Sequence, residues 1–145
     1  MMEQNFKNHT RLVPGFHFVL GILIVTGLLG AIIGIFHALD TTKLNLHNAL
    51  LILILFVIVA LLFWYSRSFA IKAQDRAIRA EENLRYFALT GKLLPSELRM
   101  GQIIALRFAP NEEFLSLVDR AVAEKLSGKE IKIAIKNWRG DYHRA

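Results

Sequence analysis

Two long apolar stretches dominate the first half of the chain. Residues 12–39 and residues 44–66, which are 28 and 23 residues long, contain no Asp, Glu, Lys or Arg. About 20 apolar residues in a helix are enough to cross the ~30 Å hydrocarbon core of a bilayer. The pattern therefore predicts two transmembrane helices, at 16–39 and 44–66. Pro14 and Gly15 favour a helix start at the first of them, because proline is tolerated in an initial turn.

The four residues 40–43 leave room only for a turn, so we expect the two spans to form a hairpin. Basic residues gather outside the far ends of the spans, at Lys7 and Arg11 and again from Arg67 onward, whereas the turn carries Lys43 offset by Asp40. Cytoplasmic flanks of spans are enriched in Lys and Arg. The N-terminal tail, 1–15, and the C-terminal part are thus expected in the cytoplasm, with the turn outside.

Two other interpretations of the apolar stretches fit the sequence less well. A secretory signal peptide would have a shorter apolar segment and a small-residue cleavage site before Asp40. A soluble bundle of very hydrophobic helices would need a polar face, which 51–63 lacks. We therefore expect an all-α membrane protein.

Small residues recur along one side of the first span. Gly27, Gly30, Gly34 and Ala38 are spaced by three or four residues, and Gly30–Gly34 forms a GxxxG pattern. Small residues let helix backbones approach closely in lipid. The stripe is predicted to pack either against the second span of the same hairpin or against another chain.

After the second span, residues 67–91 have no internal proline or glycine and predict a juxtamembrane helix that continues the span and ends at Gly91. Its apolar stripe is Phe69, Ala73, Ala77, Ala80, Leu84 and Phe87, and Glu81/Arg85 is an i,i+4 ion pair.

Residues 92–145 predict a basic cytoplasmic domain of short helices. One helix should begin at Pro95 and run to Ala109, and a second should be capped by Asn111 and stopped by Ser127-Gly128. The isoleucines within 129–138 also alternate as in a strand, but with no second strand to pair we expect a helix. Three short helices make a small core, so docking on the long helix, the membrane or a partner is expected.

Composition and charge indicate the kind of partner. The chain is 54% hydrophobic and 21% charged, and residues 67–145 hold 15 Lys and Arg against 10 Asp and Glu. Such a basic surface suits anionic lipid or an acidic protein, and we expect these rather than nucleic acid. The candidate headgroup-binding or partner-binding residues are Arg67, Lys72, Arg76, Arg79, Lys132, Lys136, Trp138 and Arg139.

Catalytic motifs are absent from the sequence, which contains no HExxH, no CxxC and no glycine-rich phosphate loop. His37 and His47 flank the turn at similar depth, and a closed hairpin could bring them together to hold haem or a metal, with Asp40 nearby. Interfacial histidines bonded to water or headgroups are the plainer interpretation. We expect no cofactor and no catalytic residue.

Four segments carry a family resemblance: 5–11, 74–85, 103–109 and 130–139. Together they resemble an uncharacterised bacterial family of small two-span membrane proteins, seen notably in Bacteroidota. The resemblance covers nearly the whole chain and implies the two-span architecture and a bacterial inner-membrane location, without an activity.

These patterns favour a non-enzymatic membrane scaffold or accessory subunit, which self-associates or joins a larger membrane complex through its cytoplasmic face. The alternative is a homo-oligomeric channel or transporter component, although only Thr26 places a hydroxyl group deep within a span. Haem or metal binding through His37 and His47 is the third hypothesis.

Overall fold

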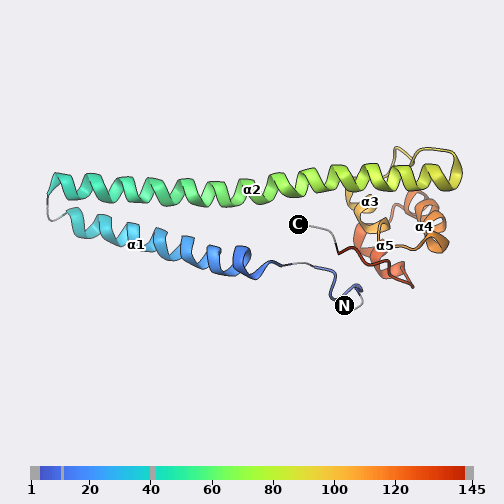
Figure 1. Cartoon of the computed structure of the whole chain (residues 1–145), viewed down its shortest axis with the longest axis horizontal. Helices are drawn as coiled ribbons and strands as arrows, with labels where there is room; N and C mark the ends of the chain where they lie inside the picture. The colour runs from blue at the N-terminus through green and yellow to red at the C-terminus, as the bar shows by residue number, and fades with distance from the viewer. Residues whose placement is uncertain (1–3, 11, 40–41, 143–145) are drawn as a thin grey trace. The chain divides into compact units, whose positions relative to one another are not determined.

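The computed structural model describes residues 4–10, 12–39 and 42–142, and this part of the chain is helical without strands. The elements are η1 (Gly15–Leu20), α1 (Gly21–Leu39), α2 (Lys43–Thr90), α3 (Met100–Leu106), α4 (Asn111–Ala123) and α5 (Gly128–Ala134) (Figure 1). The predicted all-helical class is confirmed. η1 and α1 together, and α2, are the two helices long and apolar enough to cross a membrane. The four turn residues include 40–41, which lie outside the described residues.

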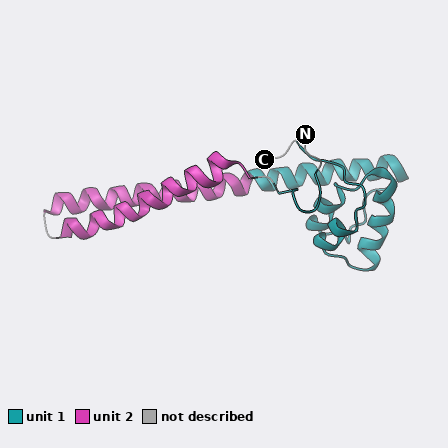
Figure 2. Cartoon of the chain, turned by 90° about the horizontal axis from the view of Figure 1, so that it is seen from below, with its two compact units in different colours: residues 1–11, 70–145 teal, residues 12–69 magenta. Residues whose placement is uncertain are grey.

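The chain divides into two compact units (Figure 2). Residues 12–69 form one, which we call the apolar unit. Residues 1–11 and 70–145 form the other, which we call the terminal unit. Helix α2 contributes its first part to the apolar unit and its last part to the terminal unit.

In the apolar unit, α1 and α2 meet along a seam with a seven-residue repeat. On α1, Ile24, Ala31 and Ala38 are buried at intervals of seven. On α2 a set of partly buried positions, with Val59 partly buried beside it, also follows three- and four-residue steps: Leu46, Ala49, Leu53, Phe56, Ala60 and Phe63. This spacing keeps one stripe of each helix facing its partner. At one end Phe16 stacks on Phe63, with ring centroids 4.5 Å apart.

The terminal unit has a hydrophobic core built from α3, α4 and α5. Its largest fully buried side chains are those of Phe108, Phe114, Ile103, Leu106, Ile131 and Val118. α3 and α5 approach so closely that a Cβ at Gly128 would overlap the carbonyl oxygen of Gly101. The amide of Gln102, which is buried, accepts from Arg99 N–H at 2.7 Å and donates to the Leu126 carbonyl at 2.8 Å, so this polar group is satisfied inside the core.

Helix α2 packs on this core with a face that differs from the predicted one. Ile78 and Glu82 are 5% and 4% exposed and Tyr86 is partly buried, whereas Leu84 is 68% exposed. The short helices therefore pack on the long helix, one of the three surfaces expected for their docking, but away from its Phe69–Phe87 apolar stripe. The physical reason is that Glu82 and the neighbouring Arg85 form a polar joint with the following loops, described below.

Several helix ends also differ from the sequence-based prediction. α3 begins at Met100 rather than Pro95, because Pro95–Leu98 closes a separate turn and Gln102 caps the helix at Arg99. Asn111 is the first residue of α4 rather than its cap. Ser127 does not stop α4; its hydroxyl accepts from Glu130 N–H and so caps α5.

Two predictions about ends are confirmed. α2 runs unbroken to Thr90, and Gly91 follows with φ of 72°, a left-handed conformation that favours glycine. The segment after Gly128 is helical, although it ends at Ala134 instead of Trp138, because Ile135 turns to extended backbone.

Candidate functional site

A cluster of charged side chains lies where α2 meets the start of α4 in the terminal unit. Arg85 of α2 donates through Nε to the Asn111 Oδ1 atom at 2.8 Å and through a terminal nitrogen to the Ala109 carbonyl at 2.8 Å. Its guanidinium carbon lies 4.1 Å from the centroid of the Phe114 ring. Arg85 thus links α2 to three residues of the 109–114 segment: Ala109, Asn111 and Phe114.

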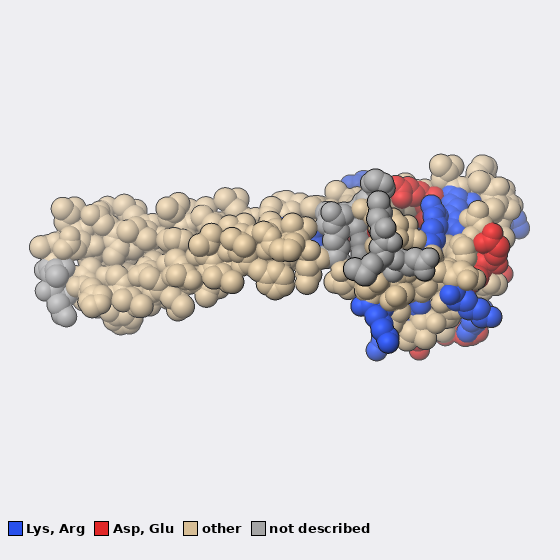
Figure 3. All heavy atoms as spheres, turned by 60° about the horizontal axis from the view of Figure 1, so that its bottom comes forward, with Lys and Arg blue, Asp and Glu red and all other residues tan. Residues whose placement is uncertain are grey.

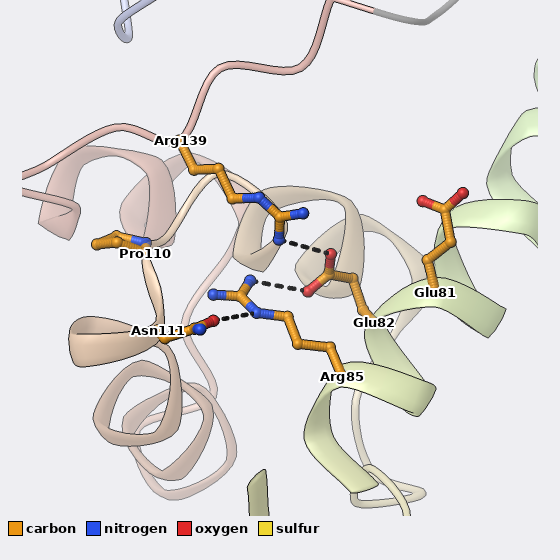
Figure 4. A pocket seen from close by; sticks show the side chains of 6 residues that line it. All are labelled: Glu81, Glu82, Arg85, Pro110, Asn111 and Arg139. Atoms are coloured by element: carbon orange, nitrogen blue, oxygen red, sulfur yellow. Dashed lines mark hydrogen bonds and ion pairs between the residues drawn. The ribbon is translucent and has the colours of Figure 1, made fainter. Parts of the chain in front are cut away.

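Glu82 stands at the centre of this cluster. Arg85 donates to its Oε2 atom at 3.1 Å, and the Arg139 guanidinium lies 3.9 Å from its Oε1 atom (Figure 4). Glu81, one residue earlier, points away from the cluster in the same view, so the predicted Glu81/Arg85 pair is replaced by Glu82/Arg85. Burial raises the pKa of Glu82 above its ordinary value, and the attraction of Arg85 offsets part of that increase.

A second ion pair lies beside the first. Arg107 is 8% exposed and its guanidinium lies 2.9 Å from an Asp141 carboxylate oxygen. The Arg107 guanidinium carbon also sits 4.7 Å from the Phe108 ring centroid. Two neighbouring hollows, of about 480 and 400 Å³, are lined by these two groups of residues, and Glu81, Glu82 and Arg139 line both.

The charged side chains that line these hollows neutralise one another. The carboxylates of Glu82 and Asp141 each face a guanidinium within 4 Å, and the arginines also hold backbone carbonyl or aromatic groups. Removing one member of a buried pair leaves an uncompensated charge, which is strongly destabilising. The arrangement therefore acts first as a joint that fixes α2 and the C-terminal segment to the core.

The predicted small-residue stripe of α1 is divided by the structure. The Phe56 ring fills the space beside Gly27 so closely that a Cβ there would overlap it, and Ala38 is buried. Gly30 is exposed and Gly34 partly exposed, and a Cβ at either position would meet open space. In this structure α2 does not fill the space beside Gly30 and Gly34, because the seam runs through Ile24 and Ala31 instead. Contact of these two glycines with another chain stays a prediction.

The predicted basic residues on α2 are accessible. Lys72, Arg76 and Arg79 are exposed, and Arg67, in the apolar unit, is partly buried. In the terminal unit charged side chains of both signs reach the surface, whereas the visible face of the apolar unit is almost entirely uncharged (Figure 3).

The predicted residues near the C-terminus have structural contacts of their own. Trp138 packs on Phe108, with ring centroids 4.9 Å apart, and Lys132 Nζ donates to the His9 Nε2 atom at 3.0 Å. Arg139 reaches Glu82 while its side chain is 56% exposed, and Lys136 is exposed. Lys132 and Trp138, whose ring also lies 5.7 Å from that of His9, therefore link the N-terminal segment to the rest of the terminal unit.

The histidines proposed as ligands lie on the surface of the apolar unit. His37 lies in the last turn of α1 and His47 in the first turns of α2, and both are exposed. Asp40 lies outside the described residues. Over 4–10, 12–39 and 42–142, no three His, Asp or Glu side chains gather as a metal site would require.

Sequence reasoning missed the residues that build the joint. The sequence did not single out Glu82, Arg107 or Asp141, and it placed His9 and Gln4 in the expected N-terminal tail, 1–15. The Gln4 amide both donates to the Asp141 carbonyl at 3.0 Å and accepts from its N–H at 2.8 Å. The one signal in the sequence is the i,i+3 spacing of Glu82 and Arg85, since such neighbours share a helix face.

The fold defines a class: all-helical proteins with two helices long and apolar enough to cross a membrane, followed by a small helical unit. The chain belongs to a family of unknown function, DUF6526, whose model matches residues 1–145. This agrees with the predicted resemblance to an uncharacterised family; the bacterial origin stays a prediction. Neither curated proteins nor solved structures gave a match.

Proposed function

We propose that this protein is a non-enzymatic scaffold or accessory subunit of a bacterial inner membrane. A transmembrane hairpin, 16–39 and 44–66, anchors it, both termini are cytoplasmic, and the terminal unit binds partner proteins or lipid headgroups at the cytoplasmic face. The proposal includes no catalytic residue and no cofactor.

The exposure of the apolar helices is the observation that carries this proposal. In the most apolar 18-residue windows, 11% of the residues on α1 and none on α2 are buried. A core helix of a soluble protein would be mostly buried, and large contiguous apolar surfaces require a cover. Lipid is the cover that fits both the length and the apolar character of these helices.

The terminal unit supports the binding role. The largely buried Glu82 and Arg85 neutralise each other, and the more exposed Arg139 also approaches Glu82, so these groups are engaged in holding the fold. Basic side chains such as Lys72, Arg76 and Arg79 stay exposed on the segment expected next to the membrane. Lys and Arg beside a span are attracted to anionic headgroups and to acidic partners.

Site-specific labelling tests the membrane topology. The chain contains no cysteine, so Lys43→Cys near the turn and Ser96→Cys in the terminal unit are each a unique thiol, at positions that are both exposed. We expect the protein to stay in membranes washed with alkaline carbonate. A membrane-impermeant maleimide applied to spheroplasts should label Lys43→Cys, and should label Ser96→Cys only after the membrane is broken. Carbonate release, or the reverse labelling pattern, would overturn the proposal.

Crosslinking in native membranes, followed by detergent extraction and mass spectrometry, tests the binding role. We expect crosslinks between the terminal unit and another chain, and we expect Arg79→Glu to weaken them. Lys125→Glu, a matched charge reversal at a residue after α4 rather than on α2, should retain them. A protein that stays strictly monomeric under these conditions would contradict a scaffold role.

A further inference from the structure

An apolar face of α2 remains uncovered within the terminal unit. It consists of Ala70, Ala73, Ala77, Ala80, Leu84 and Phe87. All six are exposed, and the two large members, Leu84 and Phe87, are 68% and 50% exposed. The core of the unit packs instead on Ile78 and Glu82, so this face has no occupant within the described chain.

The spacing of the face is that of a coiled-coil seam. Its members follow steps of three and four residues in strict alternation, which places Ala70, Ala77 and Leu84 at one seam position and Ala73, Ala80 and Phe87 at the other. A seven-residue repeat of this kind lets two helices wrap around each other with interlocking side chains. The alanines allow close approach at one end, and Leu84 and Phe87 fill the other.

Charges beside the seam distinguish the partner. In a parallel pair of helices, the residue just before a seam position of the first kind, that of Ala70, Ala77 and Leu84, faces the partner residue five positions further along the chain. Arg76 precedes Ala77, and five residues on lies Glu81; both are exposed. A second copy in parallel register therefore places Arg76 against Glu81 of the other chain, twice by symmetry. In an antiparallel pair like flanks meet, and this match is lost.

We propose that residues 70–87 of α2 form a parallel two-stranded coiled coil with a second copy of this chain. This inference rests on the proposed function, since two copies inserted alike in one membrane present α2 in the same direction. Lipid is a poor cover for this face: the seam extends about 26 Å along the helix, at 1.5 Å per residue, whereas the headgroup layer is only several ångströms deep.

Disulfide crosslinking of single cysteines tests the seam in the full-length protein. Ala77→Cys and Ala80→Cys lie at seam positions, and Arg79→Cys lies between them on the outer side. A disulfide forms only where the two Cα atoms come within about 7 Å, which equivalent seam positions of a parallel pair satisfy. In oxidised native membranes we expect several-fold more dimer for Ala77→Cys and Ala80→Cys than for Arg79→Cys. Equal yields at all three positions, or none, would overturn the proposal.

Charge reversal tests the register. In the Ala80→Cys background, we expect Arg76→Glu or Glu81→Arg to lower the dimer yield several-fold, and the double reversal to restore it. Trp138 emission, measured in a Trp64→Phe background, monitors the fold of the terminal unit in each variant. Reversals that leave the yield unchanged, or a double variant that does not recover, would contradict the parallel pairing.

The outcomes separate this inference from the membrane proposal. A protein retained after carbonate washing but without crosslinks at Ala77→Cys and Ala80→Cys keeps the membrane anchor and loses the coiled coil. A protein released by carbonate that still crosslinks at these positions does the opposite. Crosslinks from Ala77→Cys to a chain of another mass, or labelling of that site by a photoreactive lipid, would assign the face to a different occupant and overturn the second-copy proposal.

Discussion

Glu113 shows how one side chain in this protein serves a role that its position in a helix does not reveal. It lies in the first turn of α4, where its charge favours the helix dipole. Its carboxylate also accepts from the backbone N–H groups of Lys136 and Asn137, at 2.9 and 3.0 Å, and from the Asn137 side chain at 2.9 Å. It therefore fixes the chain just after α5.

Replacement of Glu113 by glutamine should weaken this attachment. Slight burial opposes ionisation of Glu113, but the hydrogen bonds from Lys136 and Asn137 outweigh it and lower the pKa below its ordinary value. We expect Glu113→Gln to lower the free energy of unfolding by about 1–2 kcal/mol at neutral pH, because charged acceptors make stronger hydrogen bonds. Urea unfolding of the detergent-solubilised chain, followed by Trp138 emission in a Trp64→Phe background, measures it.

The pH dependence has a defined sign. A carboxylate whose pKa is lower in the folded state stabilises the fold fully above its unfolded pKa of 4.5, and this contribution disappears as the pH falls through the folded pKa. The difference between wild type and Glu113→Gln should therefore shrink in acid. Glu112→Gln, at the exposed neighbouring position, should have little effect; an equal loss there would refute the specific role of Glu113.

At the scale of the element, the rotation of α1 about its axis decides which of its small residues must stay small for α1 to pack on α2. Gly27 lies on the seam against Phe56, and Gly30 lies less than one turn away on an exposed surface. Both have the same helix propensity, so a leucine at either position gains equally from propensity. Any difference between the two variants isolates packing.

We expect Gly27→Leu to destabilise the contact of α1 with α2 by about 1–3 kcal/mol, the usual cost of overpacking, and Gly30→Leu to leave it unchanged. Loss of helical circular dichroism on heating in detergent measures both variants. A Gly30→Leu variant that unfolds at least as early as Gly27→Leu would show that the Gly30 face is already packed, for instance against another chain.

At the scale of the molecule, residues 4–10 pack against the segment that follows α4. The His9 ring lies 5.7 Å from Trp138 and 5.9 Å from Phe108, centroid to centroid, and its Nε2 atom accepts from Lys132. Because an ammonium group only donates, Nδ1 carries the proton and donates to the Phe6 carbonyl at 2.8 Å. The terminal unit is thus completed by residues 4–10.

We expect His9→Ala to lower the free energy of unfolding of the terminal unit by about 1 kcal/mol, since an aromatic pair is worth roughly that beyond its buried area. The readout is again Trp138 emission during urea unfolding in the Trp64→Phe background. His47→Ala, in the apolar unit, is the matched control. No change in His9→Ala would mean that the N-terminal segment adds nothing to the stability of the unit.

Much of the architecture could be predicted because its signals are local. The helix positions were predicted from uninterrupted apolar runs, from proline and glycine at helix ends and from the spacing of α4. The predicted helix ends differ from the observed ones by a few residues, as at Pro95 and Ser127. Phe114, Leu117 and Val118 are buried on one face of α4, as their helical spacing indicates. The joint could not be predicted, since Glu82, Arg107 and Asp141 look like any solvated charge until distant segments meet.

By itself, the sequence determined the helical class, the two long apolar helices and the break at Gly91, because each follows from neighbouring residues along one chain. Only the tertiary structure decided which face of α2 is covered. Local periodicity favours the alanine and leucine face, yet Arg85 and Glu82 satisfy backbone and side-chain groups of loops many residues away. Unpaired buried polar groups are costly, so satisfying them fixed the phase of α2 and left its apolar seam uncovered.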